Sequence, residues 1–302
     1  MARGIYTTRH MEPTSPKAHL LERLSQKLSS SSKRVYSSRD LAALFDELRT
    51  EWNLPKNLTR SKFQKLVIEN GTLEEIRLTA TYPFDSKRFH HGPFTNYELA
   101  LSLRPDSYLS HGSAAFLHGL TDQEPEFIYV NKEQSPKNRS GPLSQAGINR
   151  ALSNKQRQST FIVTHAKTRI MLLSGKDSGR LGVKQTKGSQ GETLDVTNIE
   201  RTLIDIAVRP EYAGGVRNVL QCYVRTNKTL SVERVSGMLA DLEYLYPYHQ
   251  AIGFFLKCAG YHSSALRVLR EPKLRFDFFL AHAMKKTKYD KEWRITYPAD
   301  FE

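Results

Sequence analysis

The hydrophobic residues between positions 16 and 71 recur at spacings of three and four, which predicts three successive helices. The first two apolar stripes consist of leucines and one phenylalanine: Leu20, Leu21, Leu24, Leu28, Leu41, Leu44, Phe45 and Leu48. The third segment, NLTRSKFQKLVIENG, carries Phe63, Leu66 and Val67 on one face. Thr59 is expected to cap this helix and Gly71 to end it. This order is typical of a helix-turn-helix unit.

The pattern changes after the third helix, where apolar and polar residues alternate and predict two strands around a turn. The second strand is the short basic segment SKRFHHG. A two-stranded ribbon directly after the third helix predicts the wing of a winged helix-turn-helix, with Arg77, Lys87 and Arg88 on its surface. His90 and His91 are neighbours on a strand and point to opposite faces. Contacts of the wing to phosphate are therefore favoured over a shared metal ion.

Beyond residue 94, helical and strand-like segments alternate and predict a larger mixed α/β domain. Ser110 and Ser231 are expected to cap helices, and Thr197 with Glu200 fits a capping box at the start of another. The strand-like segments are EFIYVN, TFIVTH, RIMLLS, LRFDFFL and part of KEWRITYPADFE. The predicted fold class is α+β, divided into a flexible N-terminal tail (1–15), a winged helix-turn-helix DNA-binding domain (16–94) and the larger domain (95–302).

The net charge of the chain indicates what kind of partner it binds. The chain has 302 residues, a net charge of +14 and a pI of about 9.7, which favours a polyanionic partner, either nucleic acid or an anionic membrane surface. The only two cysteines, Cys222 and Cys258, are too few for a disulfide framework or a zinc cluster, which fits a reducing compartment. The sequence shows no secretory signal and no apolar run long enough to span a bilayer. We therefore expect a cytoplasmic protein without a membrane partner.

The side of the third helix away from its apolar stripe carries positive charges, hydroxyl groups and an amide. Lysine and arginine pair with phosphates, and glutamine can read a base edge in the major groove. A solvated helix face is the alternative interpretation. The predicted DNA-binding residues of the helix and the wing are Asn57, Thr59, Arg60, Ser61, Lys62, Gln64, Lys65, Arg77, Lys87 and Arg88.

A second group of basic residues, with few acids among them, lies between positions 150 and 187. It predicts a second basic surface for a polyanion or an acidic protein partner, with a solvated loop as the alternative. Its members are Arg150, Lys155, Arg157, Lys167, Arg169, Lys176, Arg180, Lys184 and Lys187.

Patterns typical of enzymes are absent or incomplete. No P-loop, no H-E-x-x-H and no G-x-S-x-G occurs. Gly112 and Ser113, followed by Asp122 and Glu124, are similar to the pattern of nucleotidyltransferases. That chemistry needs two carboxylates on one face of a strand, whereas these two fall in a turn ahead of a strand. We expect no catalytic residue, no metal and no cofactor.

Two acids, Asp205 and Asp277, lie in apolar segments. A buried carboxylate is costly unless it is paired, and Arg201, Arg209 and Arg275 are plausible partners. Internal ion pairs are therefore favoured over a catalytic dyad.

Several segments of the larger domain together resemble one known family. They are SYLSHGSAAFLHGLTDQEPEFIYVN, a Gly-Lys-Asp-Ser-Gly segment, IERTLIDIAVRPEYAGGVRNVL, YPYHQAIGFFLKCAGY and the closing RFDFFL…KEWRITYP. They resemble the AbiEi family, the antitoxins and transcriptional regulators of type IV (AbiE-like) toxin–antitoxin systems. The resemblance covers most of residues 57–302, and ERTLID with RPEYAGG is its most specific part. The family's order, a winged helix before an antitoxin domain, matches the order predicted above.

The resemblance implies a repressor that binds inverted repeats upstream of its own operon, in a phage-defence system. The larger domain would counter a separately encoded nucleotidyltransferase-like toxin, and the chain itself would not be an enzyme. Homodimeric or cooperative binding to double-stranded DNA is also expected. Two rival hypotheses stay open. One is a metal-dependent nucleotidyltransferase or nuclease that acts on nucleic acid through Asp122 and Glu124, or through Asp205 and Asp277. The other is a pure interaction module whose basic loop region binds a protein.

Overall fold

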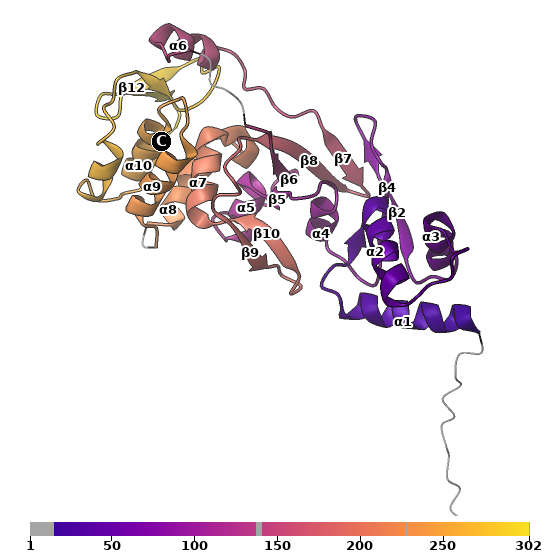
Figure 1. Ribbon diagram of the computed structural model, residues 1–302. Helices are drawn as coiled ribbons and strands as arrows, with labels where there is room; N and C mark the ends of the chain where they lie inside the picture. The colour runs from indigo at the N-terminus through magenta and orange to yellow at the C-terminus, as the bar shows by residue number, and fades with distance from the viewer. Residues whose placement is uncertain (1–14, 137–140, 228, 302) are drawn as a thin grey trace, which may run out of the picture. The chain divides into compact units, whose positions relative to one another are not determined.

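The computed structural model describes residues 15–136, 141–227 and 229–301 (Figure 1). These residues form a mixed α+β fold, as the sequence predicted, with ten α-helices and three sheets among them. They divide into two compact units. Unit 1 comprises residues 15–78 and 86–102, and unit 2 comprises residues 79–85 and 103–301.

The boundary between the units differs from the one expected after residue 94, because α4 (Asn96–Leu101) belongs to unit 1. Thr95 joins it through a capping box with Glu98. Most of the predicted N-terminal tail, residues 1–14, lies outside the described residues. Ser15, the last residue of that tail, caps the first helix by accepting a hydrogen bond from the backbone N–H of Ala18 at 3.2 Å.

Unit 1 contains the three helices predicted from the apolar stripes and the short α4: α1 (Pro16–Ser30), α2 (Ser38–Glu51), α3 (Arg60–Glu69) and α4 (Asn96–Leu101). The stripes of α1, α2 and α3 meet in one core that includes Leu24, Leu28, Leu41, Phe45, Leu48, Phe63 and Val67. The ring centroids of Phe45 and Phe63 lie 5.2 Å apart and join α2 to α3. As predicted, Thr59 caps α3, and Gly71 follows the end of this helix at a φ of +69°.

The sheet of unit 1 has three antiparallel strands in the order β1-β4-β2: β1 (Val35–Tyr36), β4 (Lys87–His90) and β2 (Glu74–Arg77). The ribbon formed by β2 and β4 was predicted, and Glu74 lies opposite His90 at one end of it. β1 has only two residues, too few for an alternating pattern to reveal it. The connection from β2 to β4 leaves this sheet, because residues 79–85 belong to unit 2.

Unit 2 is built on a seven-stranded mixed sheet in the order β3-β7-β8-β6-β5-β10-β9. The pairs β6–β8 and β5–β10 are parallel, and the other neighbours are antiparallel. The strands are β3 (Thr79–Ala80), β5 (Tyr108–Leu109), β6 (Ile128–Glu133), β7 (Ile162–His165), β8 (Thr168–Gly175), β9 (Val183–Lys187) and β10 (Thr193–Thr197).

A helical layer and a small third sheet complete unit 2 (Figure 1). The α-helices are α5 (His111–Leu117), α6 (Gln145–Ser153), α7 (Ile199–Val208), α8 (Val216–Arg225), α9 (Val232–Leu242) and α10 (Tyr248–Cys258). Two 3₁₀ turns, η1 (Pro210–Ala213) and η2 (Ala265–Leu269), follow α7 and α10. The third sheet has the order β11-β13-β12, formed by β11 (Phe278–Phe279), β13 (Ile295–Pro298) and β12 (Thr287–Asp290).

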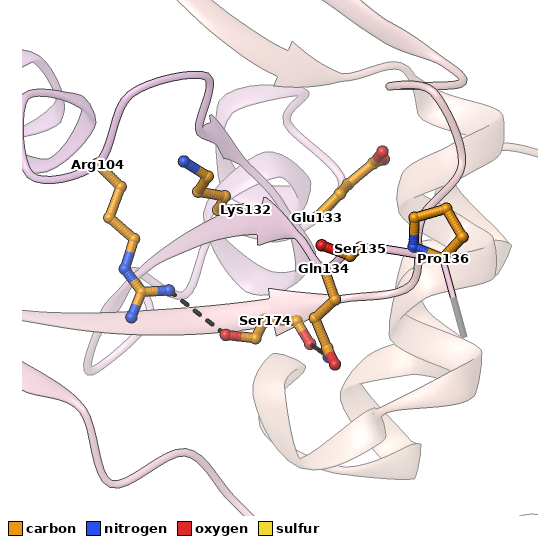
Figure 2. Close-up of a pocket in the computed structure, with 7 residues that line it drawn as sticks. All are labelled: Arg104, Lys132, Glu133, Gln134, Ser135, Pro136 and Ser174. Carbon is orange, nitrogen blue, oxygen red and sulfur yellow. Dashed lines mark hydrogen bonds between the residues drawn. The ribbon is translucent and has the colours of Figure 1, made fainter. Parts of the chain in front are cut away.

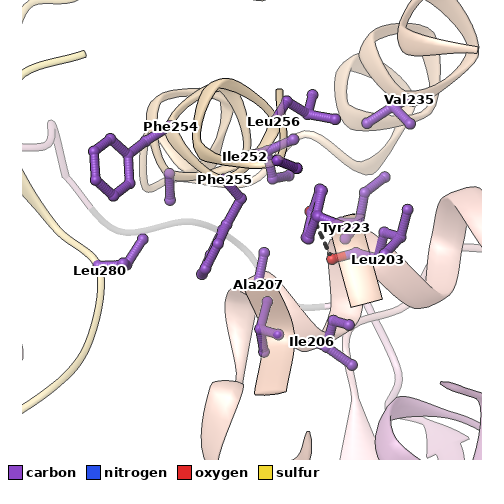
Figure 3. Close-up of a cluster of buried hydrophobic side chains, with 14 of the residues drawn as sticks. Leu203, Ile206, Ala207, Tyr223, Val235, Ile252, Phe254, Phe255, Leu256 and Leu280 are labelled. Carbon is purple, nitrogen blue, oxygen red and sulfur yellow. Dashed lines mark hydrogen bonds between the residues drawn. The ribbon is translucent and has the colours of Figure 1, made fainter. Parts of the chain in front are cut away.

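The core of unit 2 lies between α7, α8, α9 and α10 (Figure 3). The rings of Tyr223 on α8 and Phe255 on α10 stack with centroids 5.2 Å apart. The Tyr223 hydroxyl donates to the Leu203 carbonyl at 3.0 Å, so this buried polar group is satisfied. The layer is therefore held by packing between helices that are close in sequence.

Two predicted helix caps were wrong in detail. Asn198, not Thr197, caps α7, accepting from the backbone N–H of Arg201 at 2.9 Å. Thr197 is fully buried and bonds the Thr202 hydroxyl at 2.8 Å instead. Ser110 occupies the N-cap position of α5 but makes no capping hydrogen bond from its side chain. Ser231 caps α9 as predicted.

Candidate nucleic-acid interface

Helix α3 has one buried side and one exposed side. Phe63 and Val67 are 1% and 0% exposed and fix the orientation of the helix against the unit 1 core. Ser61, Lys62 and Lys65 lie on the exposed side, as do the predicted residues Asn57, Thr59 and Arg60, whereas Gln64 is half-buried. Ile68, which the apolar stripe did not explain, packs against the core. The predicted contact face of α3 is therefore open to solvent.

Lys62 is the least encumbered cation on this helix. Its Nζ donates to the Asn57 carbonyl at 3.3 Å, and it makes no ion pair within the described residues. Lys65 lies 3.6 Å from Glu69 one turn further on, with both side chains well exposed. Exposed pairs of this kind contribute little to stability, so both lysines can turn to a phosphate at small cost.

Arg60 is held more firmly. Its Nε donates to Asp46 Oδ1 at 3.0 Å, and its Nη2 donates to Oδ2 at 2.5 Å, a bidentate contact between α3 and α2. This hydrogen bonding lowers the pKa of Asp46 and raises the pKa of Arg60. Arg60 must leave the carboxylate, at least partly, before it can bind a phosphate.

The β2–β4 ribbon also contains a carboxylate that holds nearby cations, and we call this arrangement the ribbon clamp. Arg77 Nε and Lys87 Nζ donate to the two carboxylate oxygens of Glu75 at 2.9 and 3.2 Å. Hydrogen bonds from Arg77 and then Lys87 lower the pKa of Glu75. The Arg77 side chain is 84% exposed, so it remains accessible at the ribbon surface.

Arg88 was predicted as an exposed wing contact, and this was wrong. Its side chain is only 3% exposed, because alternation along β4 places it on the face opposite to Lys87. The guanidinium donates to the carbonyls of Ser102 at 3.2 Å and Lys87 at 2.6 Å. Arg88 therefore holds the end of α4 to the ribbon.

The two histidines of β4 and the following turn also have structural partners. His91 Nδ1 bonds the Thr72 carbonyl at 2.8 Å, and its Nε2 bonds the Ser29 hydroxyl at 3.0 Å. His90 Nδ1 bonds the Gly92 carbonyl at 2.9 Å. These contacts tie the ribbon to α1 and to its own turn.

The predicted second basic surface is spread over several elements of unit 2. Arg150 lies on α6, Lys167 in the turn between β7 and β8, and Lys184 and Lys187 on the edge strand β9. Lys155, Arg157 and Lys176 are exposed in connecting segments.

Two arginines of this set are already engaged by acids. Arg169 pairs with Glu126, and Arg180 pairs with Asp195 at 2.6 Å while also donating to the Asp106 carbonyl. The residues therefore share a unit without forming one uninterrupted cationic face.

The enzyme-like patterns have structural explanations in unit 2. Ser113 is fully buried, and its Oγ accepts the backbone N–H of Tyr129 at 2.8 Å. Asp122 pairs with Arg225 of α8, and Glu124 is exposed ahead of β6. Among the described residues, no group of three or more His, Cys, Asp or Glu side chains could hold a metal ion.

Both acids in apolar segments form ion pairs, but only the pair of Asp205 is internal as predicted, and the partner of Asp277 differs from the expected one. Asp205 accepts from Arg201 Nε at 2.8 Å, and both side chains are almost fully buried on α7. Asp277 accepts from Arg294 Nε at 3.0 Å and from the Tyr289 hydroxyl at 2.7 Å, rather than from Arg275. Arg294 lies in the turn directly before β13, a strand that is next to β11 only in the folded chain.

Neither the protein-family models nor the curated proteins gave a match to this chain. Among solved structures, the chain is similar to the RV2827C protein from Mycobacterium tuberculosis, with a TM-score of 0.55 and 14% sequence identity. The similarity covers 92% of this chain and 91% of that chain. At this identity it shows a shared fold alone. The helices in the described part of the chain are all too short or too polar to cross a membrane.

Proposed function

We propose that the chain is a DNA-binding transcriptional repressor and antitoxin of an AbiE-like toxin–antitoxin operon. Unit 1 acts as a winged helix-turn-helix that places α3 in the major groove of double-stranded DNA and the β2–β4 ribbon against the neighbouring phosphates. One observation carries the proposal: α3 turns Ser61, Lys62 and Lys65 to solvent, directly opposite the buried Phe63 and Val67.

The ribbon supports the same function, because it follows α3 at once and carries the exposed Arg77. The net charge of +14 favours association with a polyanion. The antitoxin assignment rests on the resemblance of the residues beyond 94 to the AbiEi family. In this proposal the protein works in the cytoplasm, unit 2 counters a nucleotidyltransferase-like toxin, and the chain has no catalytic activity of its own.

A binding experiment tests the DNA-reading helix. Fluorescence anisotropy would compare a duplex from the region upstream of the protein's own operon with a shuffled duplex at about 150 mM salt. We expect the double variant Lys62→Ala/Lys65→Ala to bind the upstream duplex at least ten-fold more weakly, since each base or phosphate contact contributes on the order of 1–3 kcal/mol. The slope of log affinity against log salt should fall by about two.

The matched control is Lys285→Ala/Lys286→Ala, which removes the same charge from two exposed lysines of unit 2. It should leave the affinity nearly unchanged. Equal binding to upstream and shuffled DNA would contradict sequence-specific repression. Equal losses in the two double variants would show that net charge, and not α3, determines binding.

The antitoxin half of the proposal has its own test. Co-expression of the chain with the product of the neighbouring gene should restore growth that the second product alone inhibits. The Lys62→Ala/Lys65→Ala variant, expressed from an unrelated promoter, should restore growth equally well because neutralisation is assigned to unit 2. Failure of the unaltered chain to restore growth would refute the antitoxin assignment.

A further inference from the structure

A pocket of about 610 Å³ opens in unit 2, lined in part by Arg104, Lys132 and Ser174 (Figure 2). We propose that this pocket binds a nucleotide, with its phosphates at Arg104 and Lys132. Its volume lies within the range of small-molecule sites, roughly 300–1,000 Å³. The proposal concerns unit 2 alone and does not depend on DNA binding by unit 1.

The pocket lies where two parallel strands end. β6 and β8 run in the same direction, with Lys132 opposite Ser174 and Glu133 opposite Gly175 at their carboxyl ends. On the other side of β6 the direction changes, because β5 pairs with it antiparallel. Ligands of open α/β sheets bind outside the carboxyl ends of parallel strands, where chain segments diverge. The sheet therefore creates this pocket at a location suited to ligand binding.

The charge inside the pocket is positive. Arg104 Nη1 donates to the Leu173 carbonyl at 3.1 Å and approaches the Ser174 hydroxyl at 3.4 Å, which orients the guanidinium while leaving its other N–H groups available to a ligand. Lys132 pairs with no carboxylate among the described residues. Figure 2 shows Arg104 reaching Ser174, and Lys132 extends from the neighbouring strand on the same side as Arg104.

Glu133 is the one acid among the described residues that line the pocket, and its carboxylate is bound by other groups of the protein. Glu133 points away from Arg104 and Lys132 (Figure 2), and its carboxylate accepts hydrogen bonds from the backbone N–H groups of Ser178 and Arg180 at 3.0 to 3.2 Å. Burial alone would raise the pKa of Glu133, but the hydrogen bonds from Ser178 and Arg180 outweigh it and lower the pKa. Glu133 thus anchors the segment after β8 instead of competing with an anionic ligand.

An exposed aromatic ring lies next to Arg104, beyond the residues that line the pocket. Phe161 is 43% exposed, the Arg104 guanidinium lies 5.9 Å from the centre of its ring, and Tyr82 packs edge-on against it at 4.9 Å. A held aromatic ring beside Arg104 suits a flat base joined to phosphates, since bases stack on aromatic rings. This surface favours a nucleotide over a bare phosphate.

Isothermal titration calorimetry on the full chain tests the proposal, with ATP and inorganic triphosphate as probes. We expect ATP to bind, and Arg104→Gln/Lys132→Gln to weaken its binding at least ten-fold because the charged hydrogen bonds to phosphate are lost. Phe161→Ala should weaken ATP about five-fold or more and leave inorganic triphosphate unchanged. The control Lys285→Gln/Lys286→Gln removes the same charge from exposed residues of unit 2 outside the pocket and should bind ATP normally.

A second variant separates loss of binding from loss of folding, because Lys132 is half-buried and its replacement can disturb the fold. Ser174 is exposed and bonds Arg104, so Ser174→Glu should preserve the fold while placing a carboxylate next to this guanidinium and abolishing ATP binding. Normal ATP binding by Ser174→Glu would overturn the proposal, as would no ATP binding by the unaltered chain at millimolar concentration. Tighter binding of a single-stranded oligonucleotide than of ATP at the same residues would assign the pocket to a nucleic-acid strand and also overturn it.

Discussion

Two glycines in neighbouring helices of unit 2 have opposite surroundings. A Cβ added at Gly253 of α10 would overlap the ring of Trp293, which is fully buried. A Cβ added at Gly237 of α9 would meet nothing within 4 Å. Packing therefore requires a glycine at position 253. At position 237 the only effect of glycine is a lower helix propensity than that of alanine.

This contrast gives a matched pair of variants. Gly253→Ala should destabilise unit 2 by about 1–2 kcal/mol, because overpacking outweighs the gain in helix propensity. Gly237→Ala should stabilise it by about 0.5–1 kcal/mol. Urea unfolding measures both. Shifts of the same sign would show that Trp293 has room to move.

His111 carries the clearest pH dependence. It sits at a φ of 51°, with ring centroids 5.3 Å from Tyr212 and 6.4 Å from Tyr129. Burial, and then the positive charges of Arg209 and Arg201, lower its pKa to about 4. An unfolded histidine has a pKa near 6.5, so between these values the unfolded chain binds more protons than the folded one.

The stability that the neutral His111 contributes is therefore present above pH 6.5 and is lost progressively as the pH falls towards 4. Between pH 7 and pH 5 the loss from this residue should be about 2 kcal/mol. His111→Asn keeps a side chain that tolerates positive φ and should reduce the pH dependence of the unfolding free energy by that amount. An unaltered dependence would show that the ring is accessible to protons in the folded state.

At the scale of single residues, the contacts that the sequence predicted correctly are those between residues close together in the chain. The caps by Thr59 and Ser231 and the pair Arg201–Asp205 involve residues three or four apart, so helical geometry brings them together. The partner of Asp277 lies seventeen positions away in the turn before β13 and could not be inferred from spacing.

Among the elements, α3 and the β2–β4 ribbon present fewer unpaired cations than their sequence suggests. Asp46 engages Arg60, and Glu75 engages both Arg77 and Lys87. Asp46 lies on α2, apart from the segment that carries Arg60, whereas Glu75 lies on β2 two residues before Arg77. The sequence identified the cations but not these contacts, because those of Asp46 with Arg60 and of Glu75 with Lys87 depend on how the elements pack.

Removing the ribbon clamp should strengthen the DNA binding that we propose for unit 1. Glu75→Gln releases Arg77 and Lys87 from a carboxylate, so affinity should rise about two- to five-fold, and the salt dependence should steepen. Glu74→Gln is the control, because it changes the net charge equally at an exposed neighbour and spares the clamp. Anisotropy titrations compare the two variants. Equal gains would contradict a specific role for the clamp.

The lengths of the elements explain which ones the sequence revealed. The helices α1, α2 and α3 have ten to fifteen residues, long enough for a period of three and four to be recognised. The strands β1, β3 and β5 have two residues each and show no alternation. The pocket at β6 and β8 was also missed, because residues 104, 132 and 174 converge only through the sheet.

At the scale of the whole molecule, the chain passes between the two units three times, after residues 78, 85 and 102. The segment Thr79–Asp85 interrupts unit 1 and supplies β3, which pairs with β7. Thr81 reinforces this pairing: its N–H donates to the Ile162 carbonyl at 3.0 Å, and its hydroxyl donates to the Thr160 carbonyl at 2.6 Å. Unit 1 is thus not a fragment that can be cut off at one position.

Thr81→Pro tests how strongly this segment is held. It removes both the backbone donor and the hydroxyl, so β3 should detach from β7, and the amide of Ile162 should exchange hydrogen at least ten-fold faster. Thr81→Val also loses the hydroxyl that accepts from the Ile162 amide at 3.1 Å, but it keeps the backbone N–H and should show a smaller increase. Unchanged exchange in Thr81→Pro would show that the aromatic contacts of Tyr82 and Phe161 alone hold the segment.

The pairing of β3 with β7 also determines the order in which parts of the chain can fold during synthesis. Ala80 emerges from the ribosome long before Val163, the residue it faces in the sheet. At translation rates of about 5–20 residues per second, this interval lasts roughly 4–16 s. The helices of unit 1 and the ribbon beside them can assemble in that time, but the loop that joins the ribbon strands has to wait. The first-made part of this protein therefore reaches its final form only after most of the sheet of unit 2 has been translated.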